Sequence, residues 1–360
     1  MDVASLKERL KAKIESDNVE KSSTLSTGSI LLNHAISGRD EGLIPGHYYM
    51  LVGDSQAGKT WLAHQILAEA SINPIYDSYQ LILDNPERGA LMDVRKFFGQ
   101  RLADRLKPPS KQGSSRTLEE FYDNVGDVSV KGPFIYVLDS EDALPSESQI
   151  AKVDENKTAR RKGKETKGSY GDGKAKVNSA GLRIAHNCLE ETKSILIVIK
   201  QTRDNIGFDA MFNPKTRSGG RALTFYAAVE LWFSIRGKLE RTVLGKKRQI
   251  GSILRVAVKK NRVAGRQRSV DLHFYPDVGF DDVGSCIAWL IEEKHWQKKG
   301  EGIVAPEFDF EGTTEELVKL IESKGKGRLL RKVMGKAWGK IEEACRVERK
   351  SRYSISGDSK

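Results

Sequence analysis

The sequence predicts an α/β fold in which a mainly parallel, twisted sheet carries helices on both faces. Two observations support this class: apolar runs with the length of strands alternate with helix-like segments, and a glycine-rich loop directly follows the first run. At 360 residues, with 38% hydrophobic and 30% charged residues, the chain can bury one large core with smaller appendages. We expect three parts: an N-terminal helix and linker (1–25), an α/β core (26–280) and a small, basic, helical C-terminal domain (281–360).

A short amphipathic helix is predicted over residues 2–16, because Val3, Leu6, Leu10 and Ile14 recur at helical spacing. Such a helix either docks on a neighbouring molecule or packs on its own chain, and the spacing does not decide between the two. No apolar run resembles a secretion signal or approaches the roughly 18 residues of a membrane span. We therefore expect a cytoplasmic protein without a membrane partner.

The glycine-rich loop fits the pattern G-x-x-x-x-G-K-[ST], which binds nucleotide phosphates. It lies between a strand-like run (47–52) and a helix-like run (61–70), the context that such a loop requires. Its lysine would reach the β- and γ-phosphates, and its threonine hydroxyl would bind Mg²⁺. The alternative is a strand–turn–helix corner whose glycines only make the turn tight. The predicted nucleotide-binding residues are Gly53, Asp54, Ser55, Gln56, Ala57, Gly58, Lys59 and Thr60.

Polar residues stand at the ends of the next three predicted strands. Glu87 follows the second strand, Asp139 the third and Gln201 the fourth. Because carboxyl ends of parallel strands meet at one edge of a sheet, we expect all three beside the phosphate loop. An apolar strand that ends in aspartate behind such a loop is the Walker B pattern, whose carboxylate holds Mg²⁺; the alternative is that Asp139 caps a turn. These strands are predicted over residues 79–84, 133–138 and 195–200.

Two stretches in the second half of the core are basic and long. Residues 151–176 hold nine Lys or Arg against four Asp or Glu, and residues 202–221 form a long connection between strands. We predict loops in both places, which either contact phosphates or are solvated insertions. The residues expected to contact nucleic acid are Arg160, Arg161, Lys162, Lys174, Lys176, Arg203, Lys215, Arg217 and Arg221.

The C-terminal region and the whole chain are basic. Residues 324–352 hold eleven Lys or Arg against three Glu in a helical pattern, which predicts a cationic face that is either phosphate-binding or simply solvated. The formal net charge of +11 favours a nucleic-acid partner, although a basic surface without a partner would give the same number. Cys188, Cys286 and Cys345 show no Cys-x-x-Cys spacing, so we expect neither disulfides nor a zinc site.

The order of these motifs resembles the RecA family of homologous-recombination ATPases from about Ser26 to Trp289. The expected fold is therefore a RecA-like P-loop ATPase core. The resemblance, together with the missing signal peptide and the altered C-terminus, leads us to expect a phage-encoded member in the host cytoplasm. The most specific segments cover residues 26–29, 138–140, 199–203, 219–227 and 258–262.

The resemblance implies a helical filament of identical protomers on single-stranded DNA, with ATP and Mg²⁺ between protomers. Such a filament is a DNA-dependent ATPase that promotes homologous pairing and strand exchange with duplex DNA. Gln201 would sense the γ-phosphate, and Glu87 stands where the family has the carboxylate that activates water. Lys260 and Arg262 fall where the family places two cations that reach the neighbouring protomer's γ-phosphate. The family's two DNA-binding loops correspond to about residues 151–178 and 202–220.

Three departures from the family pattern matter. The family has Asp-x-Glu after the second strand, whereas Asp84-Asn85-Pro86-Glu87 places the glutamate one residue late. The first DNA-loop segment is longer and more basic than usual. The C-terminal region is basic where bacterial members tend to end acidic, which suggests duplex capture or docking on single-strand-binding or mediator proteins.

Three other functions stay open beside the recombinase. One is a RecA-like motor, helicase loader or recombination mediator that uses ATP without strand exchange. Another is a binding protein in which ATP is only structural glue. A small-molecule kinase is disfavoured, because no segment resembles an acceptor pocket and the two basic stretches would have no role.

Overall fold

The computed structural model describes residues 24–89, 91–165, 172–204, 215–217, 220–300 and 302–349. The chain divides into two compact units, Met1–Ser285 and Cys286–Lys360. The predicted N-terminal helix and part of the connection 202–221 lie outside the described residues. Within the described ranges, no helix combines the length and the apolar character that crossing a membrane requires.

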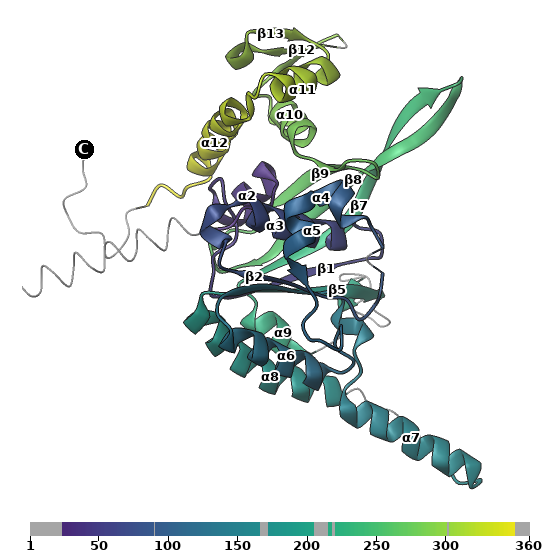
Figure 1. The fold of residues 1–360 in the computed structure, drawn as a ribbon. Helices are drawn as coiled ribbons and strands as arrows, with labels where there is room; N and C mark the ends of the chain where they lie inside the picture. Colours follow the sequence, from purple (N-terminus) through teal and green to yellow (C-terminus); the bar gives the residue numbers. More distant parts are fainter. Residues whose placement is uncertain are drawn as a thin grey trace, which may run out of the picture. The chain divides into compact units, whose positions relative to one another are not determined.

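One large sheet organises the first unit (Figure 1). In the described residues its strands are β1 (His47–Gly53), β2 (Gln80–Asp84), β3 (Leu106–Lys107), β4 (Phe134–Leu138), β5 (Ile195–Asp204), β6 (Lys215–Arg217), β7 (Val229–Val243), β8 (Lys246–Asn261), β9 (Ser269–Tyr275) and β10 (Gly279–Asp281). Their order is β10-β9-β8-β7-β1-β5-β4-β2-β3, with β6 paired to β5 on a branch. The strands from β7 through β3 pair in parallel, whereas β8, β9 and β10 add an antiparallel flank. The predicted, mainly parallel sheet is therefore confirmed.

The central strands are apolar throughout because helices cover both of their faces. Every residue of β1 after His47 is buried, and so is every residue of β4. The register pairs Gly53 at the end of β1 with Gln201 on β5 and with Phe233 on β7. The carboxyl ends of these strands consequently lie at one edge, where the site described below is built.

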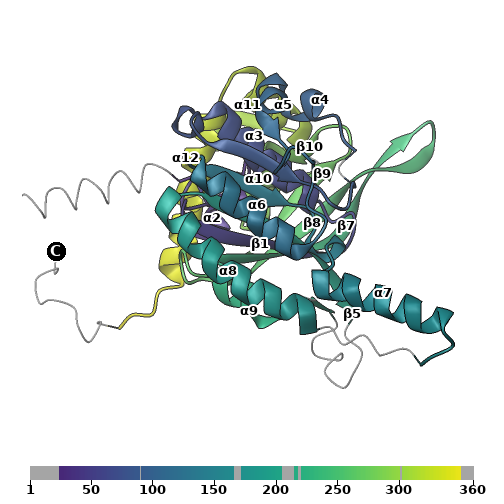
Figure 2. The same cartoon turned by 60° about the horizontal axis from the view of Figure 1, so that its bottom comes forward.

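Helices lie on both faces of this sheet (Figures 1 and 2). The helices of the first unit are α2 (Ile30–Ser37), α3 (Lys59–Ile72), η1 (Pro74–Tyr76), α4 (Val94–Phe98), α5 (Gln100–Arg105), α6 (Leu118–Val130), η2 (Glu141–Ala143), α7 (Glu147–Arg161), α8 (Asp172–Thr192) and α9 (Arg221–Tyr226). Helix α10 (Asp282–Glu292) begins in this unit and continues into the second. Helices α2 to α5 lie on one face, and α6, α8 and α9 on the other. On the second face, Phe121 and Val125 of α6 and Leu182 and Leu189 of α8 share one buried cluster with Tyr136 of β4. This core fixes the sheet edge that carries the site.

The prediction of a loop over residues 151–176 is wrong for most of the described part of that segment. Helix α7 runs to Arg161 and α8 begins at Asp172. Helix α7 has no buried residue and extends away from the sheet (Figure 1). It forms because Ser146 and Gln149 make a capping box and because Glu, Lys, Ala and Arg favour helix without any apolar face.

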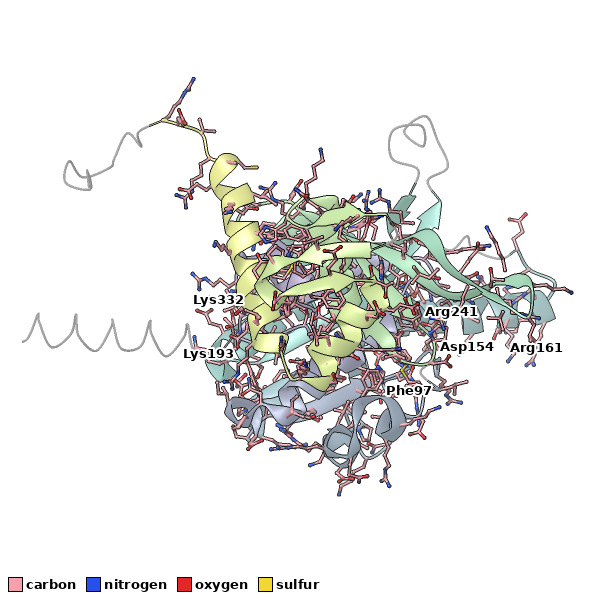
Figure 3. The ribbon with its side chains drawn as sticks, turned by 90° about the horizontal axis from the view of Figure 1, so that it is seen from above. Phe97, Asp154, Arg161, Lys193, Arg241 and Lys332 are labelled. Carbon is pink, nitrogen blue, oxygen red and sulfur yellow. The ribbon has the colours of Figure 1, made fainter. Side chains whose placement is uncertain are left out.

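Strands β7 and β8 form a long hairpin that the sequence analysis did not predict between residues 236 and 251 (Figures 1 and 3). Its turn consists of Leu244 and Gly245, whose φ angles of 52° and 75° fit a two-residue hairpin turn with both central residues left-handed. The outer residues of both strands are mostly exposed, and Figure 3 shows Arg241 on this ribbon. An exposed two-stranded ribbon carries no alternating apolar pattern, which is why it escaped prediction.

The second unit contains helices and a small sheet, and the sheet was not predicted. Its elements after α10 are β11 (Gln297–Lys299), β12 (Gly302–Ala305), η4 (Pro306–Phe308), β13 (Phe310–Gly312), α11 (Thr314–Ser323) and α12 (Gly327–Ala344). Trp289 stacks on Trp338 of α12 with ring centroids 5.4 Å apart, and the Trp296 indole donates to Glu307 at 2.8 Å. The exposed face of α12 carries Arg328, Arg331, Lys332, Lys336 and Lys340.

Candidate nucleotide-binding site

The glycine-rich loop connects the end of β1 to the start of α3, as the motif requires. A Cβ atom added to Gly53 would lie 2.6 Å from the carbonyl oxygen of Phe233 on β7, so this position needs glycine for close backbone approach. Gly58 has a φ of 86°, and an added Cβ would lie 2.8 Å from Leu254 Cδ1. Both glycines are thus required by the local backbone geometry.

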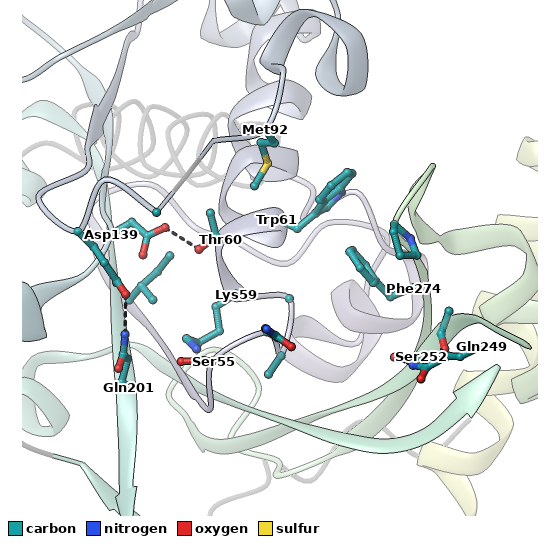
Figure 4. A pocket seen from close by; sticks show the side chains of 18 of the residues that line it. Ser55, Lys59, Thr60, Trp61, Met92, Asp139, Gln201, Gln249, Ser252 and Phe274 are labelled. Atoms are coloured by element: carbon teal, nitrogen blue, oxygen red, sulfur yellow. Dashed lines mark hydrogen bonds between the residues drawn. The ribbon is translucent and has the colours of Figure 1, made fainter. Parts of the chain in front are cut away.

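Lys59 and Thr60 begin α3 and face the sheet edge (Figure 4). The Lys59 ammonium is buried and donates to the carbonyl oxygens of Gly53 (2.8 Å) and Asp54 (2.6 Å). Burial lowers the pKa of Lys59, while the nearby charge of Asp139 opposes that shift. The ammonium group is therefore held at the inner side of the loop by main-chain oxygens of the loop, near the carboxylate of Asp139.

Asp139, at the end of β4, lies directly opposite Thr60. The Thr60 hydroxyl donates to Asp139 Oδ2 at 2.6 Å. Burial raises the pKa of the Asp139 carboxyl, although the hydrogen bond from Thr60 lowers it. A hydroxyl and a carboxylate are hard oxygen ligands of the kind that Mg²⁺ prefers.

These two groups fit a magnesium ion that is also bound by phosphate oxygens and water. In the described residues, no group of three or more His, Cys, Asp or Glu side chains could hold a metal. Mg²⁺ typically keeps several waters and takes one or two carboxylates plus substrate phosphates, and the pair of Thr60 and Asp139 suits that pattern.

Glu87 reaches the same edge despite its late position behind Pro86. Its carboxylate accepts from Gln201 Nε2 at 2.9 Å and from Ser140 Oγ at 3.0 Å. The first of these contacts is drawn as a dashed line in Figure 4. Asp84, by contrast, is buried and accepts hydrogen bonds from the Ser115 amide at 2.9 Å and from other groups nearby. Of Asp84 and Glu87, only Glu87 therefore lines the pocket.

A pocket of about 610 Å³ joins these groups and has two different walls. The polar wall consists of the glycine-rich loop, Glu87, Asp139 and Gln201. The other wall contains Trp61 and Phe274, whose ring centroids are 5.3 Å apart, together with Met92, Pro276 and residues 249–252 at the base of the β7–β8 hairpin. Such a wall can hold the flat, apolar face of a nucleobase while the polar wall holds phosphates.

The apolar wall of the pocket was not predicted from the sequence. Trp61 was assigned to a helix, and neither Trp61 nor Phe274 was given a role at the site. The position of Trp61 next to the motif residue Thr60 was the available signal. Phe274 and residues 249–252 carried none, because tertiary folding alone brings them to the loop.

Lys260 and Arg262 do not line this pocket. The Lys260 ammonium donates to the carbonyl oxygen of Phe225 at 2.9 Å and also to that of Thr224. The Arg262 guanidinium lies 5.6 Å from the centre of the Phe225 ring. Of the five predicted catalytic residues, the structure gathers Lys59, Glu87 and Gln201 at the pocket and leaves these two cations elsewhere in the same protomer.

The predicted DNA-binding residues lie on several elements. The end of α7 carries three exposed cations, Arg160, Arg161 and Lys162, of which Figure 3 labels Arg161. Lys176 is exposed on α8, and Lys174 donates to the main-chain oxygen of Asp142 at 3.2 Å. Arg203, Lys215 and Arg217 belong to the paired strands β5 and β6, and Arg221 begins α9; their side chains lie outside the described residues.

The sheet, its helices on both faces and the loop after the first strand define an α/β protein with a P-loop core. In a comparison with known sequences, residues 149–281 match the RecA N-terminal domain family. Protein RecA of Chlamydia trachomatis serovar L2 is 27% identical over 286 residues, which cover 77% of this chain and 72% of the relative. Protein RecA of the Wolbachia strain from Drosophila simulans is 29% identical over 280 residues (76% and 70%), and that of Bacteroides thetaiotaomicron 28% over 287 residues (76% and 75%).

The matching family model and these relatives support a RecA-family protein. The similarity supports a role as a RecA-like recombinase or ATPase. It extends along about three quarters of the chain.

Proposed function

We propose that this chain is an ATP-dependent recombinase that binds single-stranded DNA as a filament and promotes homologous pairing and strand exchange. The observation that carries the proposal is the pocket itself: Lys59, Thr60, Glu87, Asp139 and Gln201 come from four strand ends and meet at one edge. In a RecA-family chain this arrangement suits Mg-ATP binding and hydrolysis.

The residues of the pocket take distinct roles in this proposal. Lys59 holds the β- and γ-phosphates, and Thr60 and Asp139 hold Mg²⁺, which would neutralise charge on the phosphates when bound. Glu87 accepts the proton of the attacking water, and its hydrogen bond to Gln201 places the base beside the residue that senses the γ-phosphate.

Lys260 and Arg262 complete the site of a neighbouring protomer in this proposal. Both cations lie outside the pocket of their own chain, and both contact the segment around Phe225. Positive charge supplied by a second subunit would make hydrolysis depend on assembly, as an arginine finger does.

DNA is bound through its backbone by the basic residues of α7, α8 and the β5–β6 region. Lysine and arginine contacts to phosphates carry no sequence information, which suits a protein that acts on any homologous pair. The cationic face of α12 offers a further surface for duplex DNA, since Arg328, Arg331 and Lys332 are all exposed.

Electron microscopy with single-stranded DNA and a slowly hydrolysed ATP analogue tests the proposal directly. Helical filaments that require both the DNA and the triphosphate are expected, and a strand-exchange assay on homologous duplex should be positive. The Lys59→Ala variant is the matched control and should form no nucleotide-dependent filaments. Closed rings, or filaments without strand exchange, would instead favour a motor, loader or mediator of the same family.

A further inference from the structure

A buried cluster of charges lies directly behind the pocket edge. Lys200 of β5 has no exposed surface, and its ammonium donates to Glu141 and, at 2.9 Å, to Asp142 Oδ1. Glu141 is 1% exposed and Asp142 12% at the side chain. Three charged groups in such a place are costly to desolvate, so their arrangement is retained only where other contacts fix their geometry.

The remaining oxygens of the two carboxylates bind groups on other elements. Asp142 Oδ2 accepts from the main-chain N–H of Gln201 at 2.8 Å. Glu141 Oε1 accepts from Asn178 Nδ2 of α8 at 2.8 Å, and the Tyr122 hydroxyl of α6 donates to Asn178 at 2.9 Å. The cluster therefore connects η2, the second half of β5 and helix α8.

Helix α8 is also connected to this cluster through Lys174. Its ammonium donates to the main-chain oxygen of Asp142 at 3.2 Å. Both Lys174 and Asn178 lie in the segment expected to bind DNA, whereas Gln201 lies at the nucleotide pocket with its side chain on Glu87. The acidic pair of η2 is thus the direct contact between the two regions.

None of the three charged residues lines the pocket, so their role is not to contact the nucleotide. Side chains alternate along a strand, and Lys200 and Gln201 consequently point to opposite faces of β5. The Asp142 carboxylate binds the main-chain N–H of Gln201 and so fixes the backbone from which the Gln201 side chain reaches the pocket. Without the ammonium group, the Glu141 and Asp142 carboxylates would lose their shared counter-charge, and their repulsion would move η2.

We propose that Lys200, Glu141 and Asp142 are positioning residues that fix Gln201 against Glu87 and transmit DNA contact on α8 to the nucleotide edge. This inference rests on the proposed function of the pocket. It predicts that the cluster controls the DNA-stimulated turnover of ATP rather than the affinity for ATP.

Lys200→Met tests the proposal, with Lys131→Met, an exposed lysine at the end of α6, as the matched control. Steady-state ATPase rates with and without single-stranded DNA are compared with the affinity for a fluorescent ATP analogue. We expect Lys200→Met to lower the DNA-stimulated kcat at least tenfold, with nucleotide affinity within twofold of the parent and the control unchanged. A DNA-stimulated kcat within twofold of the parent would overturn the proposal.

Asp142→Asn provides a second test for the case in which the lysine variant is too unstable to purify. Asparagine has nearly the same size and shape as aspartate. An asparagine has one acceptor oxygen, so it can keep the contact to Lys200 or the contact to the Gln201 N–H but not both. The same selective loss of DNA stimulation is expected. Equal losses of nucleotide affinity and of kcat would indicate a general structural role and overturn the proposal.

The ATPase assays distinguish failure of the positioning cluster from failure of the proposed function. A parent protein that hydrolyses ATP no faster with DNA would refute the proposed function and this inference with it. A parent that is stimulated by DNA, together with variants that respond equally well, would refute the positioning cluster alone.

Discussion

Replacing Glu87 with glutamine tests whether this residue is the catalytic carboxylate. The substitution keeps the size of the side chain and removes its ability to take a proton. Glu87 is exposed and its contacts are the hydrogen bonds from Gln201 and Ser140. An amide can keep one of these bonds, so the loss in folding free energy should stay near 1 kcal/mol.

The effect on turnover should be far larger than the effect on stability. A general base contributes about 10²- to 10⁴-fold to the rate, which corresponds to about 2.7–5.5 kcal/mol of activation free energy. Steady-state hydrolysis with single-stranded DNA measures this loss, and a fluorescent nucleotide measures binding separately. Glu190→Gln, on the exposed side of α8, is the matched control. A Glu87→Gln rate within twofold of the parent would refute the assignment, as would a parallel loss of nucleotide affinity.

Three further predictions concern other parts of the chain. Lys59→Ala should lower ATP hydrolysis roughly 10²- to 10³-fold, because its ammonium would stabilise phosphate charge; an unchanged rate would remove the phosphate-loop assignment. Arg262→Ala should lower DNA-stimulated hydrolysis about 10³-fold while isolated protomers bind nucleotide as before, and comparable loss of both would argue against a role across a protomer interface. In the second unit, burial alone would raise the pKa of Glu307, but hydrogen bonds from Trp296 and His295 outweigh it and lower the pKa below its ordinary value of 4.5. The resulting stabilisation is present above pH 4.5 and is lost as the pH falls through the lowered pKa, so urea midpoints of the parent and Glu307→Gln should converge there; a constant difference would contradict this.

Local sequence patterns predicted which residues of the polar wall lie at the sheet edge beside the phosphate loop. The residues from Gly53 to Thr60 are contiguous, and their backbone requirements are visible in the glycines. Asp139 and Gln201 could be placed beside them because parallel strands end at a common edge. Glu87 stands one residue later than the family pattern requires, yet the turn after β2 brings its carboxylate to the Gln201 side chain.

Other features depend on contacts that the sequence does not display. Trp61 and Phe274 meet only after the antiparallel flank folds beside the loop. Helix α7 has no buried residue, so only its cap at Ser146 and its helix-favouring residues indicated it in the sequence. Lys200 stood inside an apolar run, and its two acidic partners lie about 60 residues earlier in the chain.

The two walls of the pocket come from distant parts of the polypeptide. Residues 53–61 follow β1 in the parallel half of the sheet, whereas residues 249–252 and Phe274 belong to its antiparallel flank. A ligand that contacts both walls stabilises the packing of the antiparallel flank against the parallel half of the sheet. The free energy needed to separate the two then rises with the concentration of the ligand. The resistance of the hairpin base to proteolysis would thus increase with the nucleotide concentration around the protein.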